Sequence, residues 1–248
     1  MIDLQAIGAG LMGGEFFLEY QPIVSLESNR CIGAEALSRW RRPSGVVMPN
    51  DFITQMENTP LSGLLTYWVI DTVARELGPW LRANSDIQIC INVPPEILGR
   101  GGMHYAAVNS CLMDVVDKVV LEITERGVPD KIGVDALNAM EGSGVRVALD
   151  DVDLDQANWV ILSRAKVAII KVDSVSTAQM LARGESQSIT DGLAALMRAS
   201  DFEIVVECVE SADQAEFFRK SGIRQAQGLH FSPPLAAKAF EAYFYSHQ

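Results

Sequence analysis

Residues 145–151 read Val-Arg-Val-Ala-Leu-Asp-Asp, and the interpretation of the whole chain depends on this stretch. Its valines and leucine favour a strand buried on both faces, and Ser143-Gly144 before it favours a turn. Adjacent carboxylates at a buried strand end repel each other when both ionise, and a divalent cation is the usual compensation. Taken alone, the segment favours an exposed turn, because aspartate is common in turns. The choice between these interpretations therefore rests on the other segments.

Apolar strands recur along the chain, and from the third onward each is followed by a predicted helix. We predict eight strands, at residues 16–24, 31–40, 88–93, 119–125, 145–151, 167–173, 203–210 and 225–231. Strands that alternate with helices indicate a parallel sheet, and eight of them in 248 residues indicate an α/β fold of the (β/α)8 TIM-like barrel type. A polar turn at Ser28-Asn29-Arg30 joins the first two strands, so we expect the first strand to be antiparallel.

Polar side chains stand at the ends of six consecutive predicted strands. They are Asn92, Glu122, Asp150 with Asp151, Lys171 with Asp173, Glu207 and Gln227. The C-terminal strand ends of such a barrel form its active-site rim, so we expect these groups to meet there. The second strand adds Glu35 and Arg39 on one face, which fit either a structural ion pair or a metal ligand beside a phosphate clamp.

A rim of oxygen donors with one lysine favours Mg²⁺ or Mn²⁺ as the cofactor. Zinc is disfavoured because none of the three histidines has ligand spacing. A carboxylate-rich, two-metal site is typical of phosphoryl hydrolysis. Lys171 could then orient or deprotonate the attacking water or neutralise phosphate charge, and it could equally form a salt bridge to Asp150 or Glu122.

The composition excludes some classes of partner. A net charge of −12 argues against a protein that coats DNA, RNA or an anionic membrane, although it does not exclude a small anionic ligand. The four cysteines are scattered, which is typical of reduced thiols in a cytoplasmic protein. No apolar run is long enough to span a bilayer, and we expect no signal peptide.

Residues 1–14 contain the pattern G-x-G-x-x-G at Gly8 to Gly13, which is found in dinucleotide-binding folds. That fingerprint needs a strand before it and a helix after it, whereas here residues 1–7 are weak as a strand and the segment that follows is predicted to be a strand. We therefore treat the match as incidental. We expect residues 1–14 to be a flexible lead-in or a linker from a larger protein, and residues 15–248 to be the barrel domain.

The triplet Glu35-Ala36-Leu37 resembles the signature of the EAL domain family, the bacterial cyclic-di-GMP phosphodiesterases. The resemblance extends over residues 16–245 through motifs in a fixed order: YQPIV at 20–24, EALSRW at 35–40, NV at 92–93, EITE at 122–125, LDD at 149–151, IKVD at 170–173, VECVE at 206–210 and QG at 227–228. It implies a barrel enzyme that hydrolyses cyclic-di-GMP to linear pGpG with two Mg²⁺ or Mn²⁺ ions.

The resemblance also implies roles for single residues. Glu35, Asn92, Glu122 and Asp150 are similar to the ligands of one metal, and Asp151 to a ligand of the second. Lys171 resembles the residue that holds the hydrolytic water, and Glu207 and Glu35 resemble further catalytic carboxylates. The residues that resemble the family's substrate contacts are Gln21, Leu37, Arg39, Asp173 and Gln227. Glu125 is similar to the glutamate that stabilises the loop after the Asp pair.

Two departures from the family pattern leave alternatives open. Residues 152–159 read Val-Asp-Leu-Asp-Gln-Ala-Asn-Trp where the family has a Phe-Gly-Thr-Gly-Tyr-Ser-Ser loop, and Cys208 replaces a glycine. In the family that loop couples dimerisation to the second metal, so it stays open whether this protein turns over its substrate and whether it forms a homodimer. Whether a sensory domain lies upstream also stays open. The main hypothesis is a phosphodiesterase. The alternatives are a silent module that binds cyclic-di-GMP or a protein partner, and an unrelated barrel hydrolase of another phosphodiester.

Overall fold

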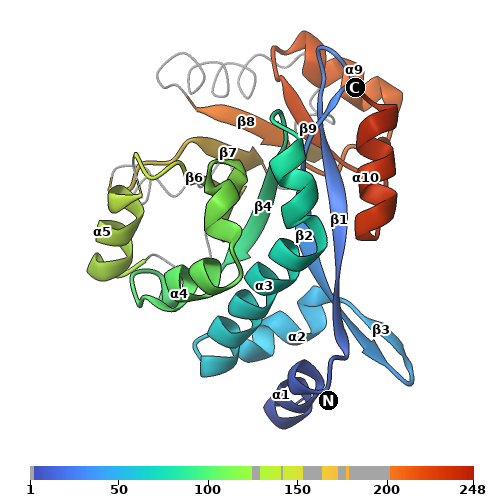
Figure 1. The fold of residues 1–248 in the computed structure, drawn as a ribbon. Helices are drawn as coiled ribbons and strands as arrows, with labels where there is room; N and C mark the ends of the chain where they lie inside the picture. Colours follow the sequence, from blue (N-terminus) through green and yellow to red (C-terminus); the bar gives the residue numbers. More distant parts are fainter. Residues whose placement is uncertain (1–2, 125–128, 141, 153–163, 173–176, 179–201) are drawn as a thin grey trace.

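The computed structural model describes residues 3–124, 129–140, 142–152, 164–172, 177–178 and 202–248. Its sheet closes into a barrel in the order β1-β9-β8-β7-β6-β5-β4-β2, with β2 paired back to β1 (Figure 1). The barrel strands are β1 (Phe16–Ser25), β2 (Cys31–Arg42), β4 (Gln88–Val93), β5 (Val119–Thr124), β6 (Arg146–Val152), β7 (Ile169–Val172), β8 (Glu203–Val206) and β9 (Gln225–Gln227). The predicted α/β barrel is therefore confirmed.

The first strand is antiparallel to both of its neighbours, as expected. β1 pairs with β2 in antiparallel orientation, from the pair Phe16 and Trp40 to the pair Ile23 and Gly33. It also pairs in antiparallel orientation with β9. The short connection leaves no room for a crossover helix, and its Asn29 takes a left-handed φ of 57°. A ninth strand, β3 (Gly45–Val47), extends β2 as a hairpin beyond the barrel.

Among the described residues, helices follow β4, β5, β8 and β9 and pack against the outer side of the barrel. The described helices are α2 (Pro49–Met56), α3 (Pro60–Ala83), α4 (Gly102–Asn109), α5 (Lys131–Ala139), α9 (Ala212–Lys220) and α10 (Ala237–Ser246), with 3-10 turns η1 (Pro95–Ile97) and η2 (Leu112–Lys118). Between α4 and η2, Cys111 has a φ of 61° and divides this segment into two helical pieces. No helix in these residues is long and apolar enough to cross a bilayer.

The N-terminal segment was predicted wrongly as a flexible lead-in. Residues Leu4–Met12 form α1, which the side chain of Asp3 caps by accepting a hydrogen bond from the amide of Ala6. Ile7 is fully buried against a cluster that includes Phe16 and Trp40. The glycine pattern lies inside this helix, with no strand before it in the described chain, so it is not a dinucleotide fingerprint. A link to a larger protein stays a prediction.

The inside of the barrel is filled by one apolar layer, formed by alternate residues of its strands. This layer consists of Ile23, Cys90, Val120, Ala148, Ile169 and Val205. The residues between them, such as Val119 and Leu121 on β5, face the surrounding helices and form the main core. The inward-facing positions one step closer to the rim are therefore the ones that can carry chemistry.

Candidate active site

Directly above the apolar layer lies a layer of polar side chains. Side chains on one face of a strand repeat every two residues, so each parallel strand that contributes an apolar residue places a polar one two positions later. Cys90 is followed in this way by Asn92, Val120 by Glu122, Ala148 by Asp150, Ile169 by Lys171 and Val205 by Glu207. The rim predicted from the sequence is thus a single compact layer.

Lys171 is at the centre of this layer, and its side chain is only 1% exposed. Its Nζ forms four ion pairs, with Glu35 and Glu122 at 3.1 Å, Asp150 at 3.0 Å and Glu207 at 2.8 Å. One ammonium group therefore faces four carboxylates within a buried space. The expected salt bridges of Lys171 to Asp150 and Glu122 are confirmed.

Glu35 accepts three hydrogen bonds from described residues of the layer and its surroundings. It accepts from Asn92 Nδ2 at 2.7 Å and from Gln227 Nε2 at 3.0 Å, in addition to the contact with Lys171. Gln227 Nε2 also donates to Gln21 Oε1 at 3.0 Å, which links β9 to β1. Four of the predicted site residues are therefore joined in one network around Glu35.

Burial and neighbouring charges shift the pKa values of the carboxyl groups in different directions. Burial alone would raise the pKa of Glu35, but Lys171 and the hydrogen bonds from Asn92 and Gln227 outweigh it and hold that pKa below its usual value. Burial raises the pKa of Glu122 well above its usual value and that of Glu207 to about 8. Burial would lower the pKa of Lys171, but its four carboxylate partners raise it well above the ordinary range.

The layer fits a divalent cation. One carboxylate oxygen from each of Glu35, Glu122 and Asp150 lies within 4.8 Å of the others. Among the described residues, no hydrogen bond reaches the two buried carboxylate oxygens of Glu122, and the positive charge that pairs with this carboxylate is that of Lys171. Oxygen ligands with an excess of negative charge are the donor set that hard cations such as Mg²⁺ and Mn²⁺ prefer.

A cleft of about 450 Å³ adjoins these carboxylates at the rim. Glu35, Asn92 and Asp150 lie on its inner side. Its apolar walls come from α2, α3 and the segment after β4, namely Ile53, Met56, Leu65, Val69, Val93, Pro94 and Pro95. The cleft can therefore hold a ligand with apolar faces close to the metal-binding group.

The remaining predicted site residues fall into two groups. Leu37 lines the cleft, but Arg39 does not, and its Nε pairs with Glu19 at 2.8 Å. The structural ion pair considered for Arg39 therefore exists, although with Glu19 and not with Glu35. Asp173, Glu125 and residues 153–163, which include all of the altered loop except Val152, lie outside the described residues. Of Asp151 only the backbone, near the end of β6, is described.

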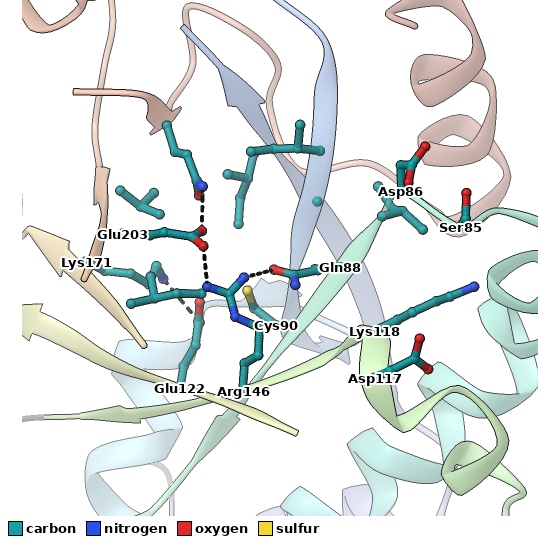
Figure 2. A pocket seen from close by; sticks show the side chains of 17 residues that line it. Ser85, Asp86, Gln88, Cys90, Asp117, Lys118, Glu122, Arg146, Lys171 and Glu203 are labelled. Atoms are coloured by element: carbon teal, nitrogen blue, oxygen red, sulfur yellow. Dashed lines mark hydrogen bonds and ion pairs between the residues drawn. The ribbon is translucent and has the colours of Figure 1, made fainter. Parts of the chain in front are cut away.

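A second cavity, of about 320 Å³, lies at the other end of the barrel, where the strands begin (Figure 2). Arg146 crosses it and donates to Gln88 Oε1 at 2.9 Å and to Glu203 Oε1 at 2.6 Å. Gln225 donates to the other oxygen of Glu203 at 2.7 Å. These polar groups satisfy one another, and in this fold the N-terminal end of the barrel serves stability, so we do not assign it to the active site.

Sequence patterns missed several residues that shape the cleft. Arg100 and Asp130 line it from the segments after β4 and before α5, and Glu96 ties this wall to the turn between α2 and α3 through Asn58 and Ser62. Glu19 was missed as the partner of Arg39. The strand alternation that places Glu35, Leu37 and Arg39 on one face could have revealed Glu19 once the pairing with β1 was known.

The profile of the EAL domain matches residues 5–234, which is most of the chain. The chain belongs to the EAL domain family. Cyclic di-GMP phosphodiesterase PA2567 of Pseudomonas aeruginosa is 29% identical over 232 residues, which cover 91% of this chain and 39% of that protein. The uncharacterised protein Rv1357c of Mycobacterium tuberculosis is 31% identical over 239 residues, which cover 92% of this chain and 78% of that protein.

Solved structures of EAL proteins share this barrel. EAL enzyme Bd1971 with bound cAMP and cyclic-di-GMP matches with a TM-score of 0.86 and 26% identity, over 97% of this chain and 67% of that one. The PaMucR phosphodiesterase in complex with cyclic-di-GMP matches with a TM-score of 0.83 and 27% identity, over 96% of this chain and 98% of that one. The resemblance to the EAL family inferred from the motifs is thus confirmed.

The backbone at Cys208 explains why the EAL family usually carries glycine at this position, but not why this domain departs from it. Cys208 follows Glu207 and has a φ of 56°, a backbone conformation that favours glycine. The glycine that the family usually carries would adopt this conformation without strain. Cys208 is exposed, so the substitution does not place its side chain in the core.

Proposed function

We propose that this EAL domain is a metal-dependent phosphodiesterase that hydrolyses cyclic-di-GMP to linear pGpG. The observation that carries the proposal is the buried Lys171 among four carboxylates beside a cleft that can hold a ligand. A catalytically silent module could keep a cleft, but it gains nothing from burying so many acids in one place, which costs free energy unless a cation compensates them. The names of the related phosphodiesterases support the same reaction and substrate.

We propose that Glu35, Asn92, Glu122 and Asp150 hold one Mg²⁺ or Mn²⁺ ion, and that Asp150 and Asp151 hold a second. Such ions supply charge for the developing negative oxygens of the phosphate and lower the pKa of a bound water. The fit rests on the three converging carboxylates and on the oxygens of Glu122 that lack a hydrogen-bond donor.

The protonation states suggest how the side chains divide the work. Lys171, whose pKa is raised, carries its proton at neutral pH and can donate a hydrogen bond to the attacking water or to a phosphate oxygen. Because a protonated lysine cannot accept a proton, we propose that Lys171 positions the water, and that Glu35, whose pKa is held low, acts as an ionised carboxylate ligand of the metal. We propose Glu207 as a further carboxylate that fixes Lys171 from the side of β8.

We propose that Gln21, Leu37, Arg39, Asp173 and Gln227 bind the substrate, with Glu125 stabilising the loop after Asp151. Gln21 and Gln227 already form a hydrogen-bonded pair beside Glu35. Arg39 Nε donates to Glu19 and Nη1 to the carbonyl of Ser38, and Nη2, which has no partner among the described residues, is the nitrogen that we assign to a phosphate oxygen. We propose a cytoplasmic setting for this reaction, in keeping with four cysteines that are reduced thiols in the structure.

The experiment that tests the proposal is product analysis with matched variants. The purified protein is incubated with cyclic-di-GMP and Mg²⁺ or Mn²⁺, and pGpG is measured by chromatography. Glu35→Ala and Lys171→Ala are expected to abolish product while the far-ultraviolet circular dichroism stays that of a folded barrel. Equal turnover by either variant would refute the assignment of its residue, and binding of cyclic-di-GMP without any product would favour the receptor hypothesis.

A further inference from the structure

The cleft beside the carboxylates has an unusual charge distribution. Of the described residues that line it, five are acidic, namely Glu35, Glu57, Glu96, Asp130 and Asp150, and only Arg100 is cationic. Glu35 and Asp150 belong to the proposed metal site, and Glu96 is occupied by hydrogen bonds from Asn58 and Ser62. Among the described residues of the cleft wall, Arg100 is therefore the one whose charge suits contact with an electron-rich group of a ligand.

Arg100 is fixed in place by a carboxylate that is itself fixed. Its Nη2 lies 2.5 Å from Asp130 Oδ2, and the other oxygen of Asp130 accepts a hydrogen bond at 2.8 Å from the amide of Gly133 at the start of α5. The Nε and Nη1 groups of Arg100 have no hydrogen-bond partner among the described residues. Asp130 takes one of the two hydrogens of Nη2, so the second hydrogen of Nη2 and a hydrogen of its neighbour Nη1 or Nε can offer a planar pair of donors to a ligand.

Arg100 lies at the open end of the cleft. The side chains of Arg100 and Asp130 are 44% and 51% exposed, whereas Glu35 and Asp150 at the inner end are buried. In a cyclic dinucleotide the two phosphates lie in the central ring and the bases form the outer ends. A substrate phosphate at the metal site therefore brings a base, and not the second phosphate, to the end of the cleft where Arg100 lies.

The walls between these two ends suit a purine base. Ile53, Met56 and Leu65 from the helices face the same cleft as Pro94 and Pro95. Such apolar surfaces pack against the faces of a planar ring system. Guanine then presents two acceptors, O6 and N7, on the edge that an arginine reads with two donors, whereas adenine places an N6 donor where guanine has O6.

We propose that Arg100, oriented by Asp130, determines specificity by reading the O6 and N7 edge of a guanine base of the substrate. The inference rests on the proposed function, since it takes a guanine cyclic dinucleotide as the ligand. It assigns the preference for guanine over adenine to one side chain outside the motifs of the sequence.

The test compares the affinities for cyclic-di-GMP and cyclic-di-AMP, measured by calorimetry with Ca²⁺ in place of Mg²⁺ so that the ligand is not consumed, in the unaltered protein and three variants. Arg100→Met removes the donors, Arg100→Lys keeps the charge but loses the planar fork, and Arg219→Met removes an equally paired arginine from the distant helix α9. The ratio of the two affinities should fall by about ten- to a hundredfold in both Arg100 variants, since a bidentate contact to guanine discriminates by roughly that factor. The ratio should not change in Arg219→Met.

Three results would overturn the proposal. They are an equal loss of affinity for both dinucleotides, an unchanged ratio in the Arg100 variants, and an unaltered protein that does not prefer cyclic-di-GMP. Chromatography for pGpG of parallel samples that contain Mg²⁺ separates this question from the reaction. If cyclic-di-GMP binds without product, the proposed hydrolysis fails, while the ratio of affinities still decides the role of Arg100.

Discussion

Lys171 Nζ lies 2.8 Å from Glu207 Oε1, so the end of β7 is joined to the residue that follows β8. The same ammonium group contacts Glu35, Glu122 and Asp150, which gives four carboxylates for one lysine. If all four carboxylates were ionised, the group would carry three negative charges in excess. This imbalance is the physical reason for expecting a divalent cation here.

Replacing Lys171 by methionine should make folding depend strongly on metal. Without its ammonium group the four carboxylates lose their common partner, and removal of one partner from a buried ion pair costs about 3–5 kcal/mol. We expect the free energy of unfolding in urea to fall by about that amount in chelator, and to recover in part with Mg²⁺ or Mn²⁺. Lys238→Met, which removes an exposed lysine paired with Glu241, is the control. If Lys171→Met unfolds in chelator at the same urea concentration as the unaltered protein, the lysine is not the counter-charge.

The stability of the metal-free protein should fall as the pH rises from about 5 to 8. The pKa of Glu207 is raised to about 8 in the folded state, above its value in the unfolded chain, so the folded state binds the extra proton in this interval. That contribution is complete below the unfolded pKa and is lost as the pH approaches 8, and Glu122 acts in the same direction. Thermal unfolding in chelator across this range should show the fall, and Glu207→Gln should flatten it.

Because a cation replaces those protons, affinity for Mg²⁺ or Mn²⁺ should rise over the same interval. Calorimetric titration at several pH values checks this, with proton release detected from the dependence on the ionisation enthalpy of the buffer. A metal affinity that does not change between pH 6 and pH 8 would contradict the assignment of the raised pKa values to the metal-binding group.

The barrel and the inner half of the site could be predicted from the sequence because both follow from the period of two along a strand. If residues 119–125 form a strand whose side chains face inward and outward in turn, Glu122 must lie on the inner face with Val120. The same reasoning places Asp150 above Ala148 and Lys171 above Ile169. Closure of the sheet then brings these side chains together without any further information.

The outer half of the cleft has no such signal. Arg100 and Asp130 come from irregular segments, and only the packing of α5 against the segment after β4 brings them within hydrogen-bonding distance. The pair formed by Glu19 and Arg39 depends on the register between β1 and β2, which the sequence leaves open. Helix α1 was missed because its two glycines lower helix propensity, and its order comes from tertiary packing.

The glycines of α1 provide a matched pair of substitutions. A Cβ at Gly10 would lie 2.5 Å from Nε1 of Trp40, whereas one at Gly8 would meet its first neighbour, Leu61, at an ordinary 3.6 Å. Gly10→Ala should therefore lower the free energy of unfolding by about 1–3 kcal/mol through overpacking. Gly8→Ala should raise it by about 0.5–1 kcal/mol through helix propensity. Urea unfolding of both variants measures the difference, and stabilisation by both would mean that α1 does not pack on Trp40.

The network at the opposite end of the barrel should matter for stability alone. Arg146→Met removes the donors that hold Gln88 and Glu203 across the cavity in Figure 2. Since the side chain of Arg146 is one quarter exposed, we expect a loss of about 1–2 kcal/mol in the free energy of unfolding. The turnover number for cyclic-di-GMP should not change, and a loss of turnover in fully folded protein would show that this end of the barrel takes part in the reaction.

The most direct test of the central claim is the formation of pGpG from cyclic-di-GMP by the purified protein, followed by chromatography with metal and with chelator. Our account predicts that product appears with Mg²⁺ or Mn²⁺ and disappears when a chelator removes the ion. Absence of product at saturating metal, together with calorimetric binding of intact cyclic-di-GMP, would contradict it. The barrel would then be a receptor, and residues 152–159 would be the first place to look for the lost step.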